Sequence, residues 1–373
     1  MKNKHISLLL STILVSMPLL TACNVGRELA RSTMDIVSNP QTDAGKQVLG
    51  SYSSKLKNLE FTCVKEQFPF LPQEADQLYR YALYHDFKNR WLPKPGVLDR
   101  YLPYYRIAAA NGHWQANLTL QEILLKSKDI NIETRERRGE GIYWNEKLMK
   151  ILPASAHYWW SLYIDVGYGP KHGPDDSLIY LRKAADLGNA KAQYEVGELL
   201  MKIQDDSSHS FRLGLTNRMQ ICAANQDRPD GMAGRMMAAT FDNAKDYVTA
   251  VNFYHQSIKA GESSSAYVLS RAFTHNKPQS QFSTWGIGED QERSRRYYQI
   301  KSFLSKNGHL KPELNVHDLD EIVPLPPAKL PNWDGKIAIQ RFVEGPAPAK
   351  PSDELVRKLA QQAGLDPNTG PPK

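Results

Sequence analysis

The stretch YLRKAADLGNAKAQYEVGELL, residues 180–200, decides the fold class. Gly188 interrupts two runs of helical character, and small residues lie on both sides of it. A glycine here can adopt the left-handed conformation that ends a helix, and small side chains let the backbones approach closely. The small residues are Ala184, Ala185, Ala192 and Gly197. The stretch therefore predicts two antiparallel helices that meet at Gly188.

The same pattern returns along the chain at a nearly regular interval. Its further copies centre on Gly112 (after Ala108 and Ala109), Leu152, Asp227 and Gly261. Successive turns are 40, 36, 39 and 34 residues apart. This spacing is typical of solenoids built from helix hairpins, in which each unit buries its apolar side against its neighbours. We therefore expect an all-α helix-hairpin repeat solenoid, with altered turns where glycine is missing.

These residues resemble the Sel-one-like repeat, a relative of the tetratricopeptide repeat with an Ala-Ala-x-x-Gly turn and a later Leu-Gly pair. The match is close at 156–200 and degenerate elsewhere. The C-terminal region, with the FTCV stretch at 61–64, also resembles an uncharacterised family of bacterial repeat lipoproteins. The resemblance implies a scaffold with a long concave surface that binds other proteins.

The N-terminus carries an export signal. A basic head precedes an almost wholly apolar stretch at 6–20, which is shorter than the about 20 residues of a membrane-spanning helix. Residues 20–23, LTAC, resemble a bacterial lipobox, which implies cleavage after residue 22 and lipidation of Cys23, including palmitate. An ordinary cleaved signal is the alternative. Asn24 favours an outer-membrane lipoprotein that faces the periplasm.

Composition divides the chain into five parts. They are a signal peptide at 1–22, a lipidated tether at 23–58, a helical repeat solenoid at 59–275, a connecting segment with the last helix at 276–310, and a proline-rich C-terminal cap with a short terminal helix at 311–373. We expect the cap to be extended and to lay Trp333 on the last repeat, because a solenoid needs its exposed end covered. A proline-rich ligand for a foreign domain is the alternative.

Cys63 and Cys222 are the two cysteines that remain in the mature chain besides the lipidated one. An exported protein meets an oxidising compartment, where such a pair favours a disulfide. Two free buried thiols are the alternative.

The sequence holds no recognisable catalytic or cofactor motif. The formal net charge of +7 comes without a zinc-finger, RNP-type or basic-zipper pattern, so nucleic acid is not an expected partner. The local groupings of acids and imidazoles are His85-Asp86, His172 with Asp175 and Asp176, and His317-Asp318 with Asp320 and Glu321. Each is interpreted as a helix-end arrangement rather than a metal or catalytic site. We expect no enzyme activity, no cofactor and no bound metal.

The expected function is binding of a protein partner. Anchored repeat lipoproteins similar to this chain are implicated as immunity proteins that neutralise type VI secretion effectors, often phospholipases, and the resemblance implies that role here. The alternative is an envelope scaffold or assembly factor that organises a protein complex. An immunity protein and a scaffold both require only a groove, so the sequence does not distinguish between these two functions.

Overall fold

The computed structural model describes residues 60–126, 134–169, 173, 175–274 and 285–371. Within these ranges the regular structure is helical and contains no β-strand, so the predicted all-α class is confirmed. None of the described helices is both long and apolar enough to cross a membrane. The predicted signal peptide, Cys23 and the tether lie outside the described residues.

The helices of the repeat array come first along the chain. They are α4 Gln73–Arg90, η1 Leu98–Arg100, α5 Leu102–Ala110, α6 Trp114–Lys126, α7 Thr134–Leu148, α8 Pro153–Asp165, α9 Asp176–Asp186, α10 Ala190–Met201, η2 Asp206–Ser208, α11 His209–Ala224, α12 Gly231–Asn243, α13 Tyr247–Lys259, α14 Ser263–Ala272 and α15 Gln291–Lys306. The C-terminal part adds η4 Gly308–Leu310, α16 Leu319–Ile322, α17 Ala338–Glu344 and α18 Asp353–Gln362.

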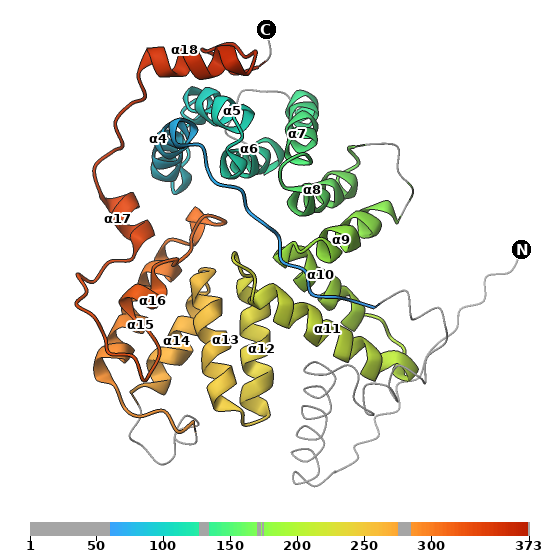
Figure 1. Ribbon diagram of the computed structural model, residues 1–373, viewed down its shortest axis with the longest axis vertical. Coiled ribbons are helices and arrows are strands. Elements are labelled where there is room, and N and C mark those ends of the chain that lie inside the picture. Colours follow the sequence, from blue (N-terminus) through green and yellow to red (C-terminus); the bar gives the residue numbers. More distant parts are fainter. Residues whose placement is uncertain (1–59, 127–133, 170–172, 174, 275–284, 372–373) are drawn as a thin grey trace, which may run out of the picture.

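The helices are arranged in a ring (Figure 1). α4 to α15 follow one another around it, and the C-terminal segment then returns to the start, where α17 contacts α4 and α18 contacts α4 and α5. Asn111 Nδ2 donates a hydrogen bond of 3.0 Å to the Leu359 carbonyl, and Arg106 Nη1 donates one of 2.7 Å to the Thr369 carbonyl. Hydrogen bonds therefore join the first helices to the end of the chain.

The proline-rich segment packs on α15 before it returns to α4. Arg296 Cζ lies 5.6 Å from the Trp333 ring centroid, and Arg296 Nη2 donates a hydrogen bond of 2.7 Å to the Pro331 carbonyl. Arg293 Nε donates one of 3.0 Å to the Pro324 carbonyl. These arginines satisfy carbonyls that have no partner in a helix or sheet. The segment thus does more than cover the last repeat, because its remaining part joins the two ends of the array.

Three glycines of the repeat pattern have positive φ. The angle is 85° at Gly112, 106° at Gly188 and 86° at Gly261, and these residues separate α5 from α6, α9 from α10 and α13 from α14. However, the most extensive helix packing joins α8 with α9, α10 with α11, α12 with α13, and α14 with α15. Gly188 therefore lies at the junction between two helix hairpins, not at the turn within one. The part of the chain that approaches Gly188 most closely is the backbone at 64–66, which precedes α4.

Candidate binding cavity

The extended segment before α4 crosses the repeat array and is fastened to it. Cys63 and Cys222 form the disulfide that the sequence favoured, with 5.6 Å between their Cα atoms. The Val64 carbonyl accepts hydrogen bonds from Gln193 Nε2 at 3.2 Å and from Gln226 Nε2 at 2.8 Å. This segment therefore occupies a fixed path from α11 toward α4.

Gly188 determines how closely this segment can approach. A Cβ atom added to Gly188 would stand 2.5 Å from the Glu66 backbone nitrogen and 2.9 Å from the Val64 carbonyl oxygen. Real Cβ atoms do not make such contacts, so the absence of a side chain is what admits the segment at this turn.

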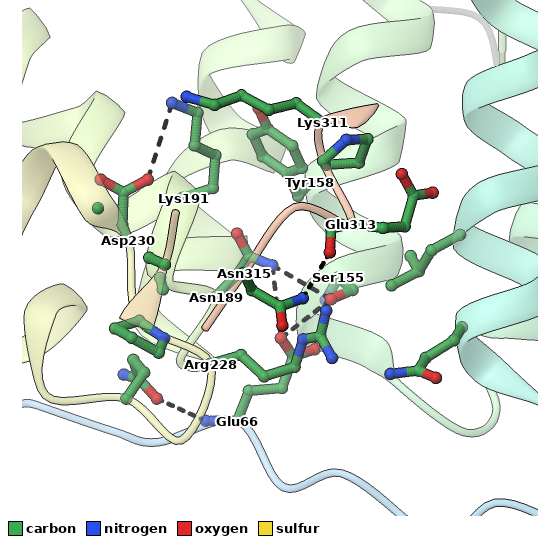
Figure 2. A pocket seen from close by; sticks show the side chains of 18 of the residues that line it. Glu66, Ser155, Tyr158, Asn189, Lys191, Arg228, Asp230, Lys311, Glu313 and Asn315 are labelled. Carbon is green, nitrogen blue, oxygen red and sulfur yellow. Dashed lines mark hydrogen bonds and ion pairs between the residues drawn. The ribbon is translucent and has the colours of Figure 1, made fainter. Parts of the chain in front are cut away.

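A cavity of about 580 Å³ lies inside the ring (Figure 2). The starts of α6, α8, α10 and α12 contribute to its wall, together with the extended segment and the loop at 311–317. Its aromatic and aliphatic lining comprises Phe68, Tyr79, Trp114, Leu118, Tyr158, Trp159, Leu162, Met232 and Leu314. Its charged lining comprises Glu66, Glu122, Lys126, Lys191, Arg228, Asp230, Lys259, Glu262, Lys311 and Glu313. The cavity can therefore offer both apolar contact and charge to a ligand.

Glu66 caps helix α8 from a distant part of the chain. Its Oε1 accepts a hydrogen bond of 2.7 Å from the Ser155 backbone nitrogen, and its Oε2 accepts one of 2.9 Å from Ser155 Oγ. α8 has no side-chain cap of its own at Leu152, so Glu66 satisfies an N–H group that the helix leaves without a partner.

The surroundings of Glu66 affect the pKa of its carboxyl in two opposite ways. Burial raises the pKa of its carboxyl above the ordinary value, because the charged form is separated from water. Hydrogen bonds from Ser155 and Asn189 act against this rise. The Asn189 side chain also accepts from the Ala192 backbone nitrogen at 2.9 Å, so the first turns of α8 and α10 belong to one polar network.

Arg228 extends into the cavity from the loop between α11 and α12 (Figure 2). Its Cζ lies 5.0 Å from the Trp114 ring centroid and 5.9 Å from that of Phe68, which are distances of cation–π contact. No hydrogen bond or ion pair joins its guanidinium to another residue that the structure describes. Burial lowers the pKa of this guanidinium, because little water reaches its charge.

The lysines of the cavity wall differ from Arg228, because each faces a carboxylate. The pairs are Lys126 with Glu122 at 2.8 Å, Lys191 with Asp230 at 3.8 Å, Lys259 with Asp320 at 2.6 Å, and Lys311 with Glu262 at 3.1 Å. Among the described cations that line the cavity, Arg228 is thus the one without such a partner.

The loop at 311–317 contributes to the cavity wall and is tied to two sides of the ring. Glu313 pairs with Arg90 of α4 at 2.7 Å and accepts a hydrogen bond of 3.1 Å from Thr119 of α6. The Val316 backbone nitrogen donates one of 2.9 Å to the Lys259 carbonyl. A Cβ atom on Gly261 would collide with the Leu314 carbonyl oxygen. This repeat glycine, like Gly188, therefore admits a crossing segment.

Most repeat residues singled out in the sequence lie in the packed core rather than in the cavity. Gly188 lines the cavity, whereas Gly197 packs against Thr216 of α11. The buried alanines are Ala108, Ala109, Ala184, Ala185 and Ala192.

The described acid and imidazole groupings lie in different places, and among them His317 lines the cavity. Asp86 pairs with Arg90 at 2.6 Å, while its neighbour His85 stacks on Tyr101 with 4.6 Å between the ring centroids. Asp320 pairs with His255 at 2.7 Å. The described residues contain no group of three or more His, Cys, Asp or Glu side chains that could hold a metal ion. His172 lies outside the described residues.

Sequence reasoning missed Glu66 and Arg228, two charged residues that line the cavity. Glu66 lies in a segment without helical periodicity, so nothing in its neighbourhood indicates its contact with α8. Arg228 lies beside Asp227, where the repeat pattern loses its glycine and the connection to the next helix lengthens. That departure from the pattern was the available signal.

Residues 265–373 match the model of a family described as a domain of unknown function, DUF6396. This match begins within α14, so it does not extend to the repeats before it, whose Sel-one-like resemblance stays a prediction. No curated protein matches the chain.

Three solved structures from Pseudomonas aeruginosa are similar. One, described as Pseudomonas aeruginosa 5086, is 27% identical with a TM-score of 0.49 and covers 72% of this chain and 95% of its own. Immunity protein Pa5087 is 24% identical with a TM-score of 0.48, again over 72% and 95%. Immunity protein PA5088 is 26% identical with a TM-score of 0.47, over 72% and 94%. With TM-scores below 0.5, these likenesses do not assign a function to the chain.

Proposed function

We propose that this protein is a non-catalytic, lipid-anchored binding protein of the periplasm that receives a segment of a partner protein in its central cavity. The observation that carries the proposal is the cavity wall, where Arg228 lies over Trp114 without an acceptor among the described residues. Arginine and tryptophan at the centre of a partly enclosed surface are typical of the residues that dominate protein–protein binding energy. A volume of about 580 Å³ lies within the range of pockets that enclose compact ligands.

We propose further that the partner is a toxic effector delivered into the periplasm and that binding neutralises it. Neutralisation by occlusion needs a rigid surface and no reaction, and the disulfide and ring closure support such rigidity. A lipid anchor would hold the protein at the membrane, where a phospholipase acts. An envelope scaffold would need the same cavity but would not protect the cell.

Site-specific photocrosslinking tests the binding surface. A photoreactive phenylalanine analogue is placed at Met232 in the cavity wall, and at Val248 in a matched control. Val248 is exposed and lies at the opposite end of α13 from the cavity residue Lys259. We expect a crosslinked partner from Met232 alone. Equal crosslinking from both positions, or crosslinking from Val248 alone, would contradict a cavity-centred interface.

Competition between sister cells tests the immunity role. Cells without this gene should be killed by parental attackers and survive attackers that lack the effector, and the wild-type gene should restore survival. If the mutant cells survive parental attackers yet lose envelope integrity on their own, the scaffold function is favoured.

The anchor is tested at Cys23. The Cys23→Ser protein should lose palmitate labelling and remain uncleaved or become soluble, because the thiol that carries the lipid is gone. Continued labelling and membrane fractionation of this variant would remove the lipobox from the proposal.

A further inference from the structure

The guanidinium of Arg228 is held in position by apolar contacts rather than by an acceptor. Trp114 and Phe68, which contact each other with 4.9 Å between their ring centroids, both lie within cation–π distance of it. A guanidinium donates its hydrogen bonds in its own plane, whereas aromatic rings contact its faces. No described residue accepts a hydrogen bond from the Arg228 guanidinium, so its N–H groups are available to a ligand.

Glu66 and Glu313 act on Arg228 from farther away. Both influence its charge electrostatically, yet neither forms an ion pair with it. Glu66 is instead committed to Ser155, and Glu313 is committed to Arg90 and Thr119. A rotation of either carboxylate toward Arg228 would break hydrogen bonds that cap α8 or tie the 311–317 loop.

The charges of the cavity lining favour an anion of low charge over a more highly charged one. Each lysine of the lining is paired with a carboxylate, so Arg228 is the lining cation without one. Glu66 adds a further acid to the same lining. A carboxylate matches the two parallel donors of a guanidinium and carries a single charge. Inorganic phosphate or a phosphate monoester carries more charge and would meet repulsion from these acids.

We infer that Arg228 is the receptor for a carboxylate on the partner, supplied by an acidic side chain that is flanked by apolar residues. The flanking residues would contact the apolar wall, to which Leu118, Leu162 and Met232 contribute. This inference rests on the proposed function, because it names the chemistry of the segment that enters the cavity.

Two short peptides serve as probes for the full-length protein in detergent. Acetyl-Leu-Asp-Leu-amide carries the carboxylate, and acetyl-Leu-Asn-Leu-amide is its neutral isostere. Isothermal titration at millimolar peptide should detect the Asp peptide and a weaker response to the Asn peptide. Inorganic phosphate is titrated separately and should bind less well than the Asp peptide.

Three variants assign the effect to Arg228. Arg228→Gln should weaken binding of the Asp peptide by about 10- to 100-fold, as expected for loss of a charge-assisted pair. Arg228→Lys should give an intermediate loss, because it keeps the charge without the planar pair of donors. Lys358→Gln removes a cation outside the cavity, one paired with the exposed Glu74 of α4, and should leave the affinity nearly unchanged. Thermal melting without peptide shows whether each variant is folded.

The outcomes separate this inference from the proposed function. Equal binding of both peptides, no binding of the Asp peptide, tighter binding of phosphate, or unchanged affinity in folded Arg228→Gln would overturn the carboxylate site. Crosslinking of the partner at Met232 would then still support the proposed function. Conversely, Arg228-dependent preference for the Asp peptide without any crosslinked partner would keep the carboxylate site and refute partner binding in the cavity.

Discussion

Gly188 and Glu66 approach so closely that no side chain fits between them, since a Cβ atom on Gly188 would stand 2.5 Å from the Glu66 backbone nitrogen. The same Glu66 caps α8 through Ser155. The repeat glycine therefore does more than end α9. It admits the segment that carries one of the central charges of the cavity, and so links the repeat pattern to the binding site.

Gly188→Ala should destabilise the protein by about 3 kcal/mol or more, from a left-handed conformation that disfavours side chains and from overlap with the 64–66 backbone. Gly112→Ala is a matched control, because Gly112 has φ of 85° but a Cβ there would meet only Pro72 Cγ, at 3.8 Å. It should lose about 1 kcal/mol. Urea unfolding of both variants gives the comparison, and equal losses would show that the crossing segment adds no steric cost.

The repeats were predictable because their pattern is local. Alanines before a glycine and small residues after it specify a helix end and a tight turn within a few positions, and the structure places positive φ at Gly112, Gly188 and Gly261. The all-α class followed from that regularity. The expected compartment and the cysteine count likewise favoured the Cys63–Cys222 pair.

The cavity was not predictable because its wall is assembled from segments far apart in the chain. Glu66 meets Ser155 across 89 positions, and Glu313 meets Arg90 across 223. Neither contact leaves a periodic trace, since one partner in each pair lies in an irregular segment. For the same reason the C-terminal segment could be expected to cover the last repeat, but not to return to α4.

The pH dependence of stability should identify the buried state of Glu66. Burial is the main cause that raises the pKa of Glu66 in the folded state. The stabilisation that its protonated carboxyl contributes to the folded protein is therefore fully present below the unfolded pKa near 4.5, and it is lost as pH rises through the folded pKa. Glu66→Gln removes this titration. The unfolding free energy of Glu66→Gln relative to wild type should therefore increase as pH rises from below 4.5 toward neutrality. A difference that stays constant over this range would show that Glu66 has the same pKa in both states.

Glu66→Ala separates charge from capping. It removes the acceptor of the Ser155 backbone nitrogen and should cost about 1 to 3 kcal/mol at neutral pH, whereas Glu66→Gln keeps an oxygen for that bond. Chemical denaturation at pH 7 gives both values. Equal stability of the alanine and glutamine variants would mean that the cap contributes little.

The disulfide should be quantitative in the native protein. Thiol titration of the unfolded, unreduced mature chain is expected to find no free thiol. Because 159 positions separate the two cysteines, the chain-entropy model gives roughly 5 kcal/mol for the crosslink. The Cys63→Ser, Cys222→Ser double variant should lose stability of this order, and reductant should destabilise wild type but not this variant. Two reactive thiols in the unreduced chain would remove the crosslink from the native protein.

Ring closure should depend on Arg90, which joins α4 to the loop at 311–317. It pairs with Asp86 at 2.6 Å and with Glu313 at 2.7 Å, and these two carboxylates are only 5% and 11% exposed. Arg90→Ala would leave both acids buried without their cation, and loss of one partner from such a network costs about 3 to 5 kcal/mol.

Lys358→Ala is the matched control for that variant, because it breaks the pair between α18 and Glu74, in which both side chains are 49% exposed. Water and salt already screen this pair, so its loss should cost less than about 1 kcal/mol. Urea unfolding together with limited proteolysis of the C-terminal segment measures stability and ring closure. Arg90→Ala should both unfold earlier and release that segment to protease, while Lys358→Ala should do neither. If the two variants behaved alike, closure would have to depend on apolar packing of α17 and α18, because the buried pair would then contribute no more than the exposed one.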